Sequence, residues 1–276
     1  MRFLVYLLIL VALFAGVRFS GVLDRYFLYF PEPLAEQDWK AVSGLPLEDV
    51  ELKTTDGFSL HGWWIPAGPG DAPVLVWCHG NAGNISNRLE HLAPLVKAGV
   101  SVMIFDYRGY GRSTGVPSET GLYVDGEAAL THVLRDRGVS PNKVVVFGQS
   151  LGSAVAAQLA NHHADLAGLI LETPFPSIVE AAHALYGKQV PVEALLNARY
   201  DVRRRLAAVH MPVLVIHGDH DSILPLPLGR AVFDAANDPK EWLLIPGADH
   251  NNTFIVGGNA YFQTLLEFIH RVTASR

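Results

Sequence analysis

The stretch KVVVFGQSLGSAVAAQLANHH, residues 143–163, contains a short apolar run, a serine between glycines and a helical segment. Lys143–Phe147 predicts a strand, and the helix is expected to begin at Leu151. The residues between them, Gly148-Gln149-Ser150-Leu151-Gly152, fit the pattern G-x-S-x-G. In such a sharp turn the serine stands above the sheet edge, and side chains at 148 and 152 would collide with the neighbouring strand and helix. Taken alone, Ser150 could also be an ordinary helix N-cap.

Outward from this stretch, the chain alternates strand and helix signals. Continuous apolar runs are typical of strands buried on both faces of a parallel sheet, and they occur at Val74–Cys78, Val100–Phe105, Leu166–Leu171, Pro212–Ile216 and Glu241–Ile245. Between them, helices are expected at about 86–98, 118–137, 151–163, 228–237 and 259–272. This alternation predicts an α/β fold with a mostly parallel, doubly wound sheet.

We expect a catalytic domain over residues 25–276. Near its start, Val50–Thr54 and Phe58–Ile65 flank Asp56-Gly57 and predict an antiparallel hairpin. Residues 174–206 interrupt the alternation with three prolines and end in a charged stretch. We interpret this segment as a small lid that lines a substrate pocket.

Residues 1–24 are a separate hydrophobic segment. Positions 3–17, FLVYLLILVALFAGV, carry no charge between Arg2 and Arg18. As a helix extended to Leu23, the segment would measure about 31 Å, which matches the roughly 30 Å hydrocarbon core of a bilayer. A single uncleaved membrane anchor is favoured, because the best cleavage sites would put a large residue at −3. A cleaved signal peptide, and hence a secreted or periplasmic protein, is the alternative.

The flanks of this segment leave its orientation open, because positive charges lie on both sides. The aromatic group that follows is interpreted as an interfacial belt or as a strand-like packing segment, and it comprises Tyr26, Phe27, Tyr29 and Phe30.

Composition argues against several other classes of protein. Half of the 276 residues are hydrophobic and only 17% are charged, which argues against a disordered or coiled-coil chain. The net charge is −6 and no basic run exceeds Arg203-Arg204-Arg205, so nucleic-acid binding is not expected. A single cysteine, Cys78, excludes an intramolecular disulfide and a Cys-rich zinc site. No HExxH motif or carboxylate cluster is present, so neither a metal nor a cofactor is expected.

Two further reactive residues follow predicted strands. His250 lies in PGADHN, residues 246–251, after the last strand and before the last helix, and Asp221 lies in HGDHDS, residues 217–222. Each is ordinary by itself, as a surface histidine and a turn aspartate. The carboxyl ends of parallel strands meet at one sheet edge, so both loops are expected beside Ser150. A serine hydroxyl needs a base to accept its proton and a carboxylate to orient that base.

A fourth segment, His79-Gly80-Asn81, follows the strand Val74–Cys78. Acyl transfer places negative charge on the carbonyl oxygen, and preorganised backbone amides stabilise that charge. We expect the amides of Asn81 and Leu151 to form this oxyanion hole. His79 is interpreted as a structural hydrogen-bonding residue, and Cys78 as a small core residue.

Together these segments resemble an α/β-hydrolase-fold serine hydrolase, in which the triad follows the order Ser150, Asp221, His250. Within that superfamily the chain is similar to the membrane-anchored, short-lidded group that includes eukaryotic acyl-protein thioesterases. The resemblance covers about residues 25 to 272. It implies Ser150 as the nucleophile, Asp221 as the acid and His250 as the base. The matching segments are residues 79–84, 106–113, 148–152, 172–175 and 215–218 with Asp221, and Asp249-His250.

Two carboxylates compete with Asp221 for the role of the acid. Asp219 lies two residues earlier, and Asp249 adjoins the base. The side chains of Asp249 and His250 should point apart in an extended loop, and the family pattern selects Asp221. Arg108 and Arg112 are interpreted as structural, with binding of an anionic substrate as the alternative.

The leading functional hypothesis is hydrolysis of a carboxylic ester or thioester through an acyl-Ser150 intermediate, without a cofactor. A serine peptidase or amidase is the alternative within the same chemistry. A non-catalytic, membrane-tethered binding module is the alternative from another class, although a scaffold has no need of a complete triad. Serine in place of aspartate argues against a dehalogenase, and the absence of G-x-G-x-x-G after the first parallel strand argues against a dinucleotide-binding enzyme. The oligomeric state is left open.

Overall fold

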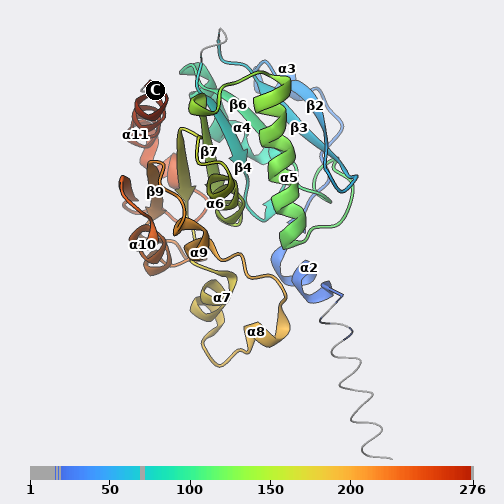
Figure 1. Ribbon diagram of the computed structural model, residues 1–276, viewed down its shortest axis with the longest axis vertical. Coiled ribbons are helices and arrows are strands. Elements are labelled where there is room, and N and C mark those ends of the chain that lie inside the picture. Colours follow the sequence, from blue (N-terminus) through green and yellow to red (C-terminus); the bar gives the residue numbers. More distant parts are fainter. Residues whose placement is uncertain (1–15, 17, 19, 69–71, 275–276) are drawn as a thin grey trace, which may run out of the picture.

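The computed structural model describes residues 16, 18, 20–68 and 72–274, and its centre is an eight-stranded sheet (Figure 1). Six neighbouring strands run parallel, and β2 and β3 complete the sheet as an antiparallel hairpin. Across the sheet the order is β10 (Lys240–Ile245), β9 (Val213–Gly218), β8 (Gly168–Glu172), β7 (Val144–Gln149), β4 (Val74–Cys78), β6 (Ser101–Phe105), β3 (Ser59–Ile65) and β2 (Glu48–Lys53). The predicted α/β fold with a mostly parallel sheet and a hairpin at its start is confirmed.

Helices cover both faces of the sheet because the parallel strands are apolar on both faces. Along β4, Val74, Val76 and Cys78 belong to one hydrophobic cluster, whereas Leu75 and Trp77 belong to the other. The first cluster is completed by α5 (Glu119–Thr131), α6 (Gly152–His162), α9 (Val202–Leu206) and α10 (Leu226–Ala235). The second is completed by α4 (Leu89–Lys97) and α11 (Thr253–Ala274), with Trp39 of α3 (Trp39–Ser43) packed against it. In Figure 1, α5 and α6 lie in front of the sheet and α4 lies behind it.

The segment that was predicted to be a lid leaves the sheet after β8. It carries the short helices α7 (Ile178–Tyr186) and α8 (Val192–Leu195), and α9 returns the chain toward the core. Figure 1 shows α7 and α8 below the sheet, at the same end of the molecule as α2 (Val22–Leu28).

The N-terminal part of the described chain pairs with the loop after β4 in a second, two-stranded parallel sheet. Here β1 (Phe30–Pro31) pairs with β5 (Ala82–Gly83), directly after α2. The aromatic group at 26–30 therefore spans a helix and a short strand, a combination that the sequence did not indicate. Among the described residues, no helix is long and apolar enough to cross a bilayer. Nearly all of the predicted anchor, residues 3–17, lies outside the described part of the chain, so the anchor stays a prediction.

Close contact between α6 and the sheet explains the two glycines that flank Ser150. A Cβ atom at Gly152 would lie 2.0 Å from the Cys78 carbonyl oxygen, and one at Gly148 would lie 2.5 Å from the Gly152 carbonyl oxygen. Both contacts are shorter than any tolerated van der Waals distance, and both involve backbone that cannot rotate away. The first turn of α6 can therefore approach β4 and β7 this closely only without side chains at these positions.

We predict that Gly152→Ala destabilises the protein by about 2 kcal/mol or more, because the new methyl group must push α6 away from β4. The Tm measured by differential scanning fluorimetry should fall by about 4–8 °C. Gly68→Ala is the matched control, since a Cβ atom there would meet nothing within 4 Å, and its Tm should stay within about 2 °C of wild type. An unchanged Tm for Gly152→Ala would show that α6 does not need this close contact.

Candidate active site

Ser150 occupies the turn between β7 and α6, and its backbone is in the left-handed region with φ of 51°. Non-glycine residues rarely adopt this conformation, and it is held here by the elements on both sides of the turn. The Ser150 amide donates to the carbonyl oxygen of Glu172 at 2.9 Å, and the Ser150 carbonyl accepts from Ser153 at 2.9 Å. The hydroxyl is thereby presented at the carboxyl edge of the sheet.

The structure brings Ser150, His250 and Asp221 together from three separate loops. His250 Nε2 lies 2.9 Å from Ser150 Oγ, and His250 Nδ1 lies 2.8 Å from Asp221 Oδ2. With a proton on Nδ1 donated to the carboxylate, Nε2 is left to accept the serine proton. His250 and Asp221 are 5% and 6% exposed, so water competes little for these hydrogen bonds.

Asp221 is fixed by its own loop. Its Oδ1 accepts from the amides of Ile223 at 3.0 Å and Leu224 at 2.7 Å, while the ring of His217 lies 3.3 Å from Oδ2. Burial acts to raise the pKa of Asp221, but the contacts with His217 and His250 outweigh it and hold the pKa well below its ordinary value. The carboxyl group is therefore ionised beside the histidine.

The two competing carboxylates have other partners. Asp249 accepts from the amide and hydroxyl of Ser222 and from the amide of His250, but not from the His250 ring. Asp219 accepts from the Gly247 amide. Both tie the 217–222 loop to the 246–250 loop, and among the three aspartates it is Asp221 that contacts the histidine ring.

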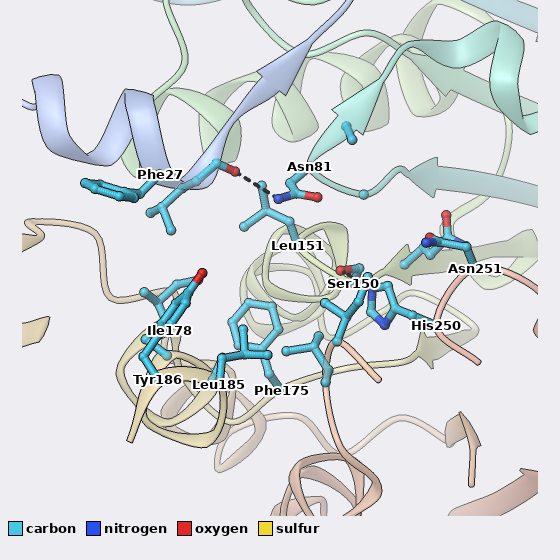
Figure 2. Close-up of a pocket in the computed structure, with 18 of the residues that line it drawn as sticks. Phe27, Asn81, Ser150, Leu151, Phe175, Ile178, Leu185, Tyr186, His250 and Asn251 are labelled. Atoms are coloured by element: carbon cyan, nitrogen blue, oxygen red, sulfur yellow. Dashed lines mark hydrogen bonds between the residues drawn. The ribbon is translucent and has the colours of Figure 1, made fainter. Parts of the chain in front are cut away.

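The loop after β4 passes beside Ser150. A Cβ atom at Gly80 would lie 3.6 Å from that of Ser150, and both Asn81 and Leu151 line the pocket around the hydroxyl. Asn81 is anchored on two sides, since its carbonyl accepts from Phe30 N at 2.9 Å and from Tyr110 Oη at 2.8 Å. Its side chain donates to the Leu28 carbonyl at 3.2 Å, the dashed line in Figure 2.

Three of the residues interpreted as structural are themselves buried. Arg108 forms ion pairs with Asp125 at 2.8 Å and with Asp56 at 2.7 Å, and it does not line the pocket at Ser150. Burial lowers the pKa of His79 to about 3, so this ring is neutral; its Nδ1 lies 2.7 Å from the Gly80 carbonyl oxygen. The thiol of Cys78 is buried and forms no disulfide.

Glu172 is a buried group whose part in the site the sequence reasoning missed. Its carboxylate accepts from Thr253 Oγ1 at 2.6 Å and from Tyr261 Oη at 2.9 Å, and its carbonyl accepts from the Ser150 amide. Burial raises its pKa, although the two hydrogen bonds act in the opposite direction. One residue thus ties the nucleophile to the start of α11, three residues after His250.

The pocket at Ser150 has a volume of about 260 Å³. Figure 2 shows its two sides: Ser150 and His250 lie together, while Phe27, Ile178, Leu185 and Tyr186 gather on the opposite side. Among the described residues that line this pocket, Arg88 is the one acidic or basic side chain apart from His250. Its Nη2 donates to the Ala82 carbonyl at 3.0 Å, and burial lowers its pKa although Glu172 acts in the opposite direction.

The pocket walls combine predicted and unpredicted residues. The expected contribution of the 174–206 segment is present in Phe175 and in the α7 side chains. Phe27 and Leu28 were missed, because their helix lies directly after the hydrophobic segment and was interpreted with it. Arg88 was missed as well. It lies nine residues after His79, in the segment that follows the same strand, and this position is the signal that could have identified it.

The chain is similar to several known proteins. Residues 71–192 match the family model described as "Serine aminopeptidase, S33". An uncharacterized protein of Mycobacterium tuberculosis is 38% identical over 264 residues, which cover 94% of this chain and 92% of that protein. The "Alpha/beta hydrolase domain-containing protein WAV2" of Arabidopsis thaliana is 33% identical, with 81% of this chain and 79% of that protein covered.

Among solved structures, the esterase Pf2001 of Pyrococcus furiosus superposes with a TM-score of 0.74 at 20% identity, covering 90% of this chain and 99% of that one. The similarity to this esterase is a similarity of fold. The proteins of Mycobacterium tuberculosis and Arabidopsis thaliana are also similar in sequence, over most of both chains. The protein therefore belongs to the α/β-hydrolase superfamily.

Proposed function

We propose that the protein is a serine hydrolase that cleaves carboxylic esters through an acyl-Ser150 intermediate, with thioesters of acyl chains as a related substrate class. The observation that supports this most is the hydrogen-bonded series Ser150–His250–Asp221 at the mouth of an apolar pocket. Each member is held by further contacts in its own loop. A catalytic nucleophile needs this combination of reach and fixed orientation.

In the proposed reaction, His250 Nε2 accepts the Ser150 proton as Oγ attacks the ester carbonyl. The carbonyl oxygen becomes negative and is stabilised by the amides of Asn81 and Leu151. The imidazolium, stabilised by Asp221, then gives its proton to the departing alcohol or thiol, which leaves an acyl-Ser150 ester. A water molecule, deprotonated by His250, attacks that ester, and collapse of the second tetrahedral intermediate returns the proton to Ser150.

The pocket lining favours esters over the peptidase alternative. An aminopeptidase must hold the positively charged amino terminus of its substrate, which calls for a carboxylate. No acidic side chain is present among the described residues of the pocket, and its charged arginine would repel an ammonium group. Apolar side chains from α2 and α7 are better suited to the hydrocarbon part of an acyl group.

We predict that Ser150→Ala abolishes hydrolysis of p-nitrophenyl butyrate while leaving the protein folded. Loss of a triad member should lower kcat by about 10⁴ to 10⁶. Ser140→Ala, an exposed serine remote from the pocket, is the matched control and should keep wild-type kcat. The measurement is a steady-state rate for proteins with equal Tm. Near wild-type kcat in folded Ser150→Ala would exclude the proposed mechanism.

The pH dependence should follow from the same hydrogen bonds. Protonated His250 cannot accept the serine proton, so kcat/KM for an uncharged ester should fall as the pH is lowered. The pKa of Asp221 lies well below its ordinary value, so this carboxylate stays ionised and does not contribute to that fall above about pH 4. The measurement is kcat/KM against pH, and a profile that stays flat on acidification to about pH 4 would argue against a histidine base.

A further inference from the structure

A second cavity adjoins the pocket at Ser150. Its volume is about 340 Å³, and it shares four lining residues with the catalytic pocket: Phe27, Leu28, Ala182 and Tyr186. The shared residues come from α2 and α7, which lie on the side of the catalytic pocket opposite His250 (Figure 2). The second cavity is therefore a continuation of the first, in the direction away from the reacting groups.

The remaining walls of the second cavity are aliphatic. They are contributed by the chain after α7 and by α8, through Val190, Val192, Leu195 and Leu196. No charged side chain lines it among the residues that the structure describes. A cavity with these walls favours hydrocarbon over any polar group.

The position of α2 over this cavity is fixed by polar contacts at both ends of the helix. At its start, Asp24 accepts from the amide of Asn197 at 2.8 Å. Just after its end, the hydroxyls of Tyr29 and Tyr200 lie 2.8 Å apart in a buried hydrogen bond. These contacts join α2 to the segment that follows α8, so the space between them is a built part of the fold.

The volumes of the two cavities are consistent with one ligand that occupies both. Pockets that bind small molecules measure roughly 300–1,000 Å³. The catalytic pocket, at about 260 Å³, falls just below that range, and the addition of the second cavity brings the site well within it. A narrow ligand without branches is what two cavities in series accommodate.

We propose that the second cavity receives the distal part of a linear, medium- to long-chain acyl group carried on Ser150, and that Ala182 determines how far the chain can extend. This inference rests on the proposed function, in which Ser150 carries the acyl group. Ala182 is half-buried and has the smallest side chain of the four residues shared by the two cavities. A bulky residue there would close the passage between them.

The test is the chain-length profile of kcat/KM for monomeric p-nitrophenyl esters from butyrate to dodecanoate. For wild type, kcat/KM should rise about fourfold for each methylene that enters the cavities. In Ala182→Trp, the dodecanoate-to-butyrate ratio of kcat/KM should fall at least about tenfold. Ala184→Trp is the matched control: Ala184 lies on the same helix, is exposed and lines neither cavity, so its ratio should equal that of wild type.

A second variant tests the same cavity independently, in case Ala182→Trp does not fold. Leu195 lines only the second cavity, so Leu195→Trp should lower kcat/KM for dodecanoate and leave the shorter end of the profile as in wild type. Wild-type dodecanoate-to-butyrate ratios in both folded variants would overturn the proposal, even though butyrate hydrolysis would leave the proposed function standing.

Binding of cis-parinaric acid, a linear fatty acid that fluoresces in apolar surroundings, separates the two claims. Titrated into Ser150→Ala, it should bind, and adding Ala182→Trp should weaken binding at least about tenfold while Ala184→Trp should not. Binding with this pattern, together with a wild-type protein that hydrolyses no ester, would support the acyl passage and exclude the proposed function. If parinaric acid does not bind and the wild-type protein hydrolyses no ester, both proposals are wrong.

Discussion

The left-handed backbone at Ser150, held by the close contact of α6 with β4 and β7, is the constraint on which the site depends. With φ of 51° at this residue, the hydroxyl is directed out of the sheet instead of along the helix. The cost of that conformation is offset by buried packing and by the hydrogen bond from the Ser150 amide to Glu172. The glycines at 148 and 152 make the contact possible. Once Ser150 is fixed in this way, loops at the carboxyl ends of neighbouring parallel strands are enough to bring His250 and Asp221 within hydrogen-bond distance.

The N-terminal part of the described chain is integrated with the site. The pairing of β1 with β5 and the contact from the Asn81 side chain to the Leu28 carbonyl fix the loop beside Ser150. The same segment provides Phe27 and Leu28 to both cavities. Polar contacts from Asp24 and Tyr29 reach the segment after α8. One short stretch therefore connects the loop beside Ser150, the two cavities and the 174–206 segment, so a change in any one of these should alter the others.

Sequence reasoning reached the sheet and the three loops that meet at Ser150, because buried parallel strands leave continuous apolar runs and turn residues mark where they end. The antiparallel hairpin was accessible for the same reason, through Asp56-Gly57. Neither α2 nor the β1–β5 pair was predicted from the sequence. Phe30 and Ala82 are far apart in the chain, and a two-residue parallel pairing leaves no periodic pattern. The role of Glu172 could not be predicted either, because the sequence does not show that Thr253 and Tyr261 donate to its carboxylate.

The central claim is that Ser150 is an activated nucleophile, and covalent labelling tests it most directly. The intact, folded protein would be treated with a fluorophosphonate, digested and mapped by tandem mass spectrometry. The account predicts one phosphonyl adduct, on Ser150, which is lost when the protein is unfolded before labelling, because only the hydrogen bond to His250 makes this hydroxyl reactive. Absence of an adduct from the folded protein, or an adduct on another serine with Ser150 unmodified, would contradict the claim.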